Sequence, residues 1–325
     1  IIGLISMKIA ADSTIMPKVP TITIWIHGTN PREIVANRIK LIQKFDNTLF
    51  ACKQGLHKIT TFTSDQHYYL LAKELSDNWP QQFGWENFYV FGWPGKLDPT
   101  NRHQAASNLY QELSTLVLQY QKEYHFIPQI NLITHSHGGN VALKMASLVD
   151  KNCSFSINRL ILLACPVQSY TIDLIKSPFF KKIYSIHSHT DIFQVLDPQG
   201  LHPFFDLKNI TEFKNAFNSS KKRPLFSQRH FPINPKIVHA CIRWTKGVSW
   251  QKPKIAMPIN TYFQSIKIAL QNIDKIKANR GLTHIEFTLL PFVSHLPQII
   301  RQLDEVINKT MHCSNNADPD IIIHL

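Results

Sequence analysis

Residues 130–141, Ile-Asn-Leu-Ile-Thr-His-Ser-His-Gly-Gly-Asn-Val, are the stretch around which the rest of the chain is arranged. A short apolar, β-prone run ends at Thr134, and apolar residues at helical spacing follow Gly139. A strand that turns directly into a helix through Ser136 strains the backbone of that serine. Its neighbours two residues away must be small, because their side chains would collide across the turn. Such a turn lifts the hydroxyl off the sheet and points the helix N-terminus at an anion forming beside it.

This stretch resembles the nucleophile elbow of the α/β-hydrolase superfamily, in the His-Ser-x-Gly-Gly form of lipases and esterases. The resemblance implies a serine hydrolase that cleaves a carboxylic ester of a lipid or other acyl substrate through an acyl-enzyme; a thioesterase would fit the same superfamily. One departure is Thr134, where the superfamily usually has glycine. The competing interpretation is an ordinary glycine turn ahead of a core helix.

The order of the predicted elements favours an α/β fold. Apolar strand-like runs alternate with helical patterns, which is typical of right-handed β-α-β units and a doubly wound, mostly parallel sheet with helices on both faces. The expected strands are residues 19–26, 83–91, 156–166, 183–186 and 283–290, besides the strand before the elbow. The expected helices are residues 32–45, 101–120, 262–276 and 296–307, besides the elbow helix.

The resembled superfamily presents its catalytic triad in the order serine, acid, histidine, at the ends of successive strands. Here Ser136 would be the nucleophile, Asp191 at the end of a strand the acid, and His295 after the last expected strand the base. Asp197 is the competing acid, but it lies in a Leu-Asp-Pro turn further from the strand end. The competing histidines are His284, inside the last expected strand, and His230 and His239, which lie between residues 200 and 260.

Backbone N–H groups are the expected oxyanion hole. The resemblance implies one donor from His137, directly after the nucleophile, and one from Thr29, in the loop that follows His27-Gly28. His27-Gly28 taken alone is an ordinary turn. Trp93, in a Trp-Pro-Gly turn after a strand, either borders the site or packs in the core.

Alternate histidines on a strand share one face, as metal ligands must. His187, His189 and Asp191 are similar to the His-x-His-x-Asp signature of metallo-hydrolases, but Ile192 stands where that signature continues with histidine. We therefore expect no metal and no organic cofactor. Loss of ester hydrolysis on chelation would favour the zinc alternative.

Residues 200–260 are rich in proline, phenylalanine and basic side chains, and they predict an insertion before the last strand. The insertion is either a lid that meets a lipid surface or a segment whose phenylalanines pack onto the sheet while its basic residues are solvated. Its charge and the net charge of +13 suit an anionic membrane surface, with Lys221, Lys222 and Arg223 as the residues to test. The alternative function is a non-catalytic protein of hydrolase fold that binds an anionic partner through this basic face. The sequence contains no RNA-binding or helix-turn-helix pattern, so we expect no nucleic-acid partner.

Length and cysteine usage bound the rest. The 325 residues, 44% of them hydrophobic, predict one α/β-hydrolase domain over 19–312, an N-terminal extension over 1–18 and a tail over 313–325. The five cysteines contain no C-x-x-C pair, which favours reduced thiols. With no recognisable signal peptide and no apolar run long enough to span a bilayer, the expected location is cytoplasmic.

Overall fold

In the computed structural model, the described residues are 20–30, 52–150, 153–195, 197, 199, 226–244, 280–312 and 320–325. The predicted N-terminal extension, the helices expected at 32–45 and 262–276, and residues 200–225 and 245–260 of the predicted insertion lie outside them. Lys221, Lys222 and Arg223 are therefore outside as well.

A mostly parallel sheet forms the centre of the molecule. Its strand order is β2-β3-β1-β4-β5-β6-β7-β8, and β9 also pairs with β7. The parallel strands are β1 (Thr21–Ile26), β3 (Phe88–Gly92), β4 (Gln129–His135), β5 (Ile157–Leu163), β6 (Phe180–His187), β7 (Ile237–Trp244) and β9 (Ile321–His324). Two short strands are antiparallel, β2 (Gly55–Lys58) and β8 (Arg280–Gly281). From β1 the chain builds first toward β3 and then in the other direction through β4 to β7. The predicted doubly wound, mostly parallel α/β sheet is confirmed.

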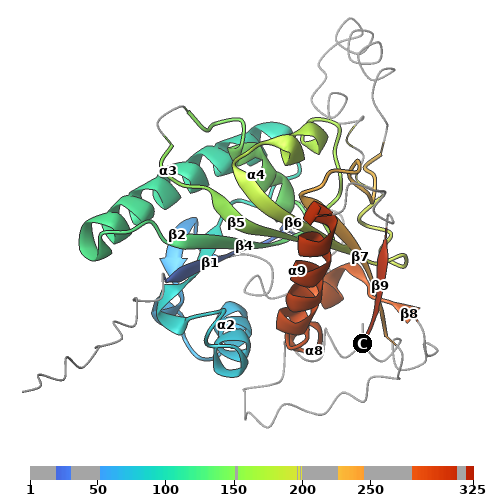
Figure 1. Ribbon diagram of the computed structural model, residues 1–325, viewed down its shortest axis with the longest axis horizontal. Helices are drawn as coiled ribbons and strands as arrows, with labels where there is room; N and C mark the ends of the chain where they lie inside the picture. Colours follow the sequence, from blue (N-terminus) through green and yellow to red (C-terminus); the bar gives the residue numbers. More distant parts are fainter. Residues whose placement is uncertain are drawn as a thin grey trace, which may run out of the picture.

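Helices cover both faces of this sheet (Figure 1). On one face lie α3 (Pro99–Tyr124) and α4 (Gly138–Met145); on the other lie α2 (His67–Asn78), α8 (Leu290–Val293) and α9 (Leu296–His312). Successive side chains of β1 point to opposite faces of the sheet, so Ile24 packs into the core beneath α3 and α4 and Trp25 into the core beneath α2 and α9. Short 3₁₀ turns complete the order: η3 (Ile59–Thr61), η4 (Trp85–Asn87), η5 (Ile172–Lys176) and η6 (His284–Thr288).

Two sequence predictions near the C-terminal half are wrong. Ile237–Trp244, assigned to the insertion, is strand β7 of the sheet and pairs with β6 in parallel. Residues 283–290, expected as the last strand, form η6 and the start of α8. The physical cause is a capping box, in which Thr283 and Glu286 satisfy each other's backbone N–H groups and start a helical turn. Arg280 Nη2 secures Glu286 at 2.6 Å.

The C-terminal elements join the domain. The predicted helix over 296–307 is confirmed as α9, which Asp304 ties to the sheet through Arg159 of β5 (2.6 Å) and Lys182 of β6 (3.1 Å). Tyr184 donates a further hydrogen bond to the same carboxylate. Within the predicted tail, β9 adds a strand beside β7. Among the described helices, none has the length and apolar content needed to cross a membrane.

Candidate active site

Ser136 occupies a strained turn between β4 and α4. Its φ of 52° lies in the left-handed region, which is costly for a residue with a side chain. Its N–H donates to the Leu163 carbonyl at 2.8 Å, so the strained residue is held by the end of β5. Gly138 passes so close to β1 that a Cβ there would lie 2.5 Å from the His27 carbonyl oxygen. The strand therefore turns into the helix through a strained, tightly packed backbone at Ser136.

Thr134 is accommodated at the position where the resembled superfamily usually has glycine. Its side chain is fully buried, and its hydroxyl donates to the Ile161 carbonyl at 3.1 Å. The β-branched residue therefore has a hydrogen-bonded place beside β5, and it does not prevent the turn.

The loop after β1 lies against the elbow. A Cβ on Gly28 would stand 2.8 Å from Ser136 Cβ, so Gly28 lets the loop approach the serine. Trp93 holds this loop: its Nε1 donates to the His27 carbonyl at 2.8 Å, and its backbone N–H donates to His27 Nε2 at 3.1 Å. Asn30 N–H donates to the Gly95 carbonyl at 2.9 Å. Thr29 therefore lies in a loop that hydrogen bonds hold next to Ser136, and the buried Trp93 makes two of those bonds.

Asp191 is buried, and it pairs with His284. Asp191 Oδ2 lies 2.8 Å from His284 Nδ1, while Oδ1 accepts the Gln194 N–H at 3.2 Å. Because a carboxylate only accepts hydrogen bonds, His284 must carry its proton on Nδ1, which leaves the Nε2 lone pair available as a base. Arg229 Nη2 donates to the Asp191 carbonyl at 2.8 Å and steadies the loop.

His284 lies beside the residue that precedes the serine. The His135 and His284 rings are 4.8 Å apart between centroids, and His135 Nε2 hydrogen-bonds the His284 carbonyl at 2.9 Å. Burial, reinforced by repulsion from His284, holds the pKa of His135 well below its ordinary value. His135 is therefore neutral at pH 7, and it places no second positive charge beside His284 when His284 accepts a proton.

His295 has a different place. It precedes α9, where its carbonyl accepts the Ile299 N–H at 3.1 Å, and its ring packs edge-on against Trp244 at 6.1 Å. The structure thus brings Asp191 to His284, whereas the sequence prediction paired Asp191 with His295. The assignment followed from the wrong last strand: once η6 replaces that strand, His284 is the first histidine after β8.

Asp197, the alternative acid, belongs to a buried network behind the elbow. Its Oδ1 lies 3.5 Å from His137 Nε2, and Gln168 donates to its other oxygen. Arg102 Nη1 contacts His137 Nδ1 at 2.6 Å. Burial first and Arg102 second lower the pKa of His137 to about 4, so its side chain stays neutral at pH 7. This network supports the first turn of α4, whose backbone includes the expected oxyanion donor of His137.

Comparisons with known proteins give distant structural likenesses. No family model matches the chain, and a comparison with curated proteins found no match. Phospholipase PlaB from Legionella pneumophila in complex with thio-NAD is 16% identical over 74% of this chain, with a TM-score of 0.31. This chain spans 40% of that protein.

Two further structures cover nearly the whole of this chain. The Bacillus licheniformis lipase BlEst2 in mature form is 12% identical over 88% of this chain and 93% of its own, with a TM-score of 0.31. An alpha/beta hydrolase superfamily protein from Enterococcus faecalis is 14% identical over 90% and 92%, with a TM-score of 0.32. Because these TM-scores are low, the chemistry is derived from this chain's own geometry.

Proposed function

We propose that the protein is a serine hydrolase that cleaves a carboxylic ester with Ser136, His284 and Asp191 as its catalytic triad. The observation that carries the proposal is the 2.8 Å contact between His284 and the buried Asp191. The His284 ring lies 4.8 Å, between centroids, from the ring of His135, which precedes a serine held at φ 52°. His284 replaces His295 in this assignment. The chain order serine, acid, histidine is kept.

Each residue has a chemical role. His284 Nε2 accepts the Ser136 hydroxyl proton as Ser136 Oγ attacks the ester carbonyl, and Asp191 stabilises the imidazolium that forms. Backbone N–H groups of Thr29 and His137 receive the negative charge of the tetrahedral intermediate. The imidazolium then protonates the leaving alcohol. Water, activated by the same histidine, hydrolyses the acyl-enzyme and restores the serine.

Apolar side chains beside the pair suggest the class of acyl group. Ile192 and Phe193, directly after Asp191, are 57% and 67% exposed, and Ile285 next to His284 is 40% exposed. The Phe193 ring lies 5.9 Å from the His284 ring. Exposed apolar residues gathered at one place mark a surface for an apolar partner. An ester with an extended acyl chain therefore suits this site better than a short polar ester.

Labelling with a fluorophosphonate probe tests the proposal. The wild-type protein should be labelled, and a folded Ser136→Ala variant should not. Turnover of p-nitrophenyl esters should fall by roughly three or more orders of magnitude in that variant. Phe193→Ser should reduce kcat/KM for long-chain esters more than for acetate. A wild-type protein that neither labels nor turns over any ester would favour the non-catalytic, anion-binding alternative.

A further inference from the structure

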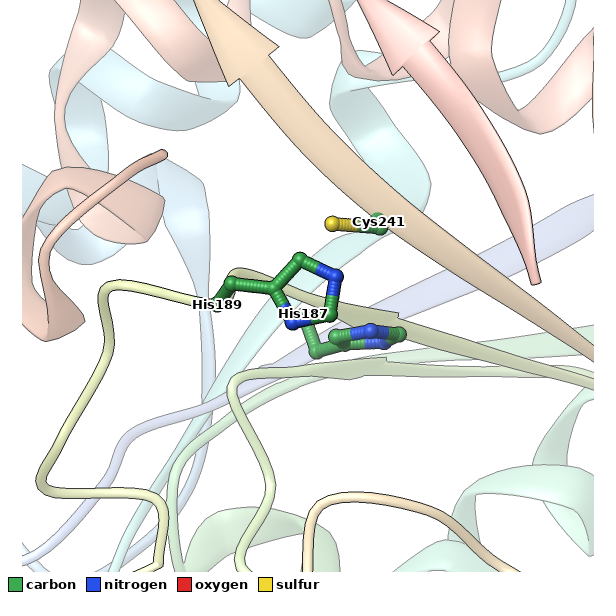
Figure 2. A group of neighbouring side chains, drawn as sticks. All are labelled: His187, His189 and Cys241. Carbon is green, nitrogen blue, oxygen red and sulfur yellow. The ribbon is translucent and has the colours of Figure 1, made fainter. Parts of the chain in front are cut away.

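A second group of reactive side chains lies where β6, β7 and β9 come together. His187 ends β6 and is the direct register partner of Cys241 on β7. In parallel strands, register partners point to the same face of the sheet. His189 follows two residues later, and Figure 2 shows His187 and His189 approaching Cys241 from the end of β6. None of these side chains has a role in the proposed ester hydrolysis.

The ligand atoms of His187, His189 and Cys241 all lie within 4.8 Å of one another. His187 is fully buried, and neither of its ring nitrogens has a hydrogen-bond partner among the described residues. A buried polar group left without a partner is costly, and it indicates an absent ligand. Cys241 is fully buried as well, whereas His189 is exposed and gives the group access to solvent.

The chemistry of the three side chains suits a soft divalent cation. Two imidazoles and one thiolate are typical zinc ligands.

We propose that His187, His189 and Cys241 bind one Zn²⁺, with water in the fourth position. The ion would join β6 to β7 just ahead of the loop that carries Asp191. A rival group shares His187 but uses His230 and Asp320. Those two already hydrogen-bond each other at 3.1 Å, and both are less buried than Cys241. The group that contains the Cys241 thiolate should therefore bind a soft metal ion more tightly than the rival group.

Metal content and cobalt spectroscopy of the full chain test the site. Purified protein should retain about one zinc per chain after dialysis, and its Tm should rise with added Zn²⁺. After replacement by Co²⁺, a thiolate-to-cobalt charge-transfer band should appear. Cys241→Ser should abolish that band, and His189→Ala, at an exposed position that leaves folding intact, should remove the bound zinc.

Cys153→Ser is the matched control, because Cys153 is half-buried and lies ahead of β5, at the opposite end of the strands. It should keep both the zinc and the charge-transfer band. Each variant should match the wild-type Tm in EDTA, which separates loss of metal from loss of fold. The proposal is overturned by a wild-type protein without stoichiometric metal. It is also overturned if Asp320→Asn, and not Cys241→Ser, removes the ion.

Discussion

His284 and His295 both follow the sheet, yet they have different neighbours. His284 holds Asp191 at 2.8 Å, and His295 packs on Trp244. We expect His284→Ala to lower ester turnover as much as Ser136→Ala, because members of a triad fail as a unit. His295→Ala should keep turnover within about threefold of the wild type, since it removes no proton acceptor. Steady-state kinetics on folded variants provide the measurement; the reverse ranking would restore His295 as the base.

The two aspartates can be separated in the same way. Asp191→Asn leaves an amide that no longer requires the proton on His284 Nδ1, so the base takes the wrong tautomer and kcat should fall by about four orders of magnitude. Asp197→Asn changes only the network around His137 and should cost much less. Loss of burst-phase acylation in Asp191→Asn would locate the defect in the chemical step. An Asp197→Asn protein as inactive as Asp191→Asn would contradict the assignment.

Among the elements, α9 is attached to the sheet through the Asp304 carboxylate and through a hydrogen bond from Lys182 to Asn308 at 3.0 Å. Burial opposes ionisation of Asp304, but hydrogen bonds from Arg159 and Tyr184 outweigh it and hold the pKa of Asp304 below its ordinary value. Asp304→Ala removes the carboxylate from Arg159 and leaves Lys182 with only its hydrogen bond to Asn308. We expect the free energy of unfolding to fall by about 2 kcal/mol, less than for a fully buried pair because the site is partly exposed. Urea denaturation measures it. Asp173→Ala, in an exposed pair with Lys176, is the control and should be near neutral.

The elements with a clear apolar pattern are those that the sequence predicts well. The apolar runs of β1, β5 and β6 and the helical spacing of α3 and α9 predicted elements that the structure contains. β7 was not predicted, because His239, Cys241 and Arg243 stand on one of its faces and interrupt the apolar run. The residues on either side of it are also basic. At the site, Ser136 lies in the predicted turn, and Asp191 lies in the loop that follows β6. His284 ranks only as a competing histidine in the sequence, because the apolar run around it favours a strand over the Thr283-x-x-Glu286 capping signal.

On the scale of the whole molecule, buried histidines link stability to pH. Burial lowers the pKa values of His27, His67 and His137 to about 4 in the folded protein, against 6.5 ordinarily. Between these values the unfolded chain binds more protons than the folded one, so stability is complete above pH 6.5 and falls as pH drops toward 4. Each histidine contributes a slope of about 1.4 kcal/mol per pH unit.

We therefore expect the urea midpoint to fall steeply between pH 7 and pH 5. His67→Gln should reduce the slope by one histidine's share even if it lowers the stability at pH 7. A midpoint that stays constant over this range would contradict the neutral buried state of these side chains. The titration needs only far-UV circular dichroism, and it is independent of any enzymatic assay.

Because the backbone at Ser136 is left-handed, thermal stability and catalytic activity favour different residues at this position. Glycine adopts that conformation freely, so Ser136→Gly should raise the stability by about 0.5–1 kcal/mol while removing the proposed nucleophile. A library enriched solely by survival of heating would drift toward glycine at this position and collect inactive clones. Directed evolution of this scaffold for heat tolerance therefore has to hold position 136 constant, or score every round for product formation.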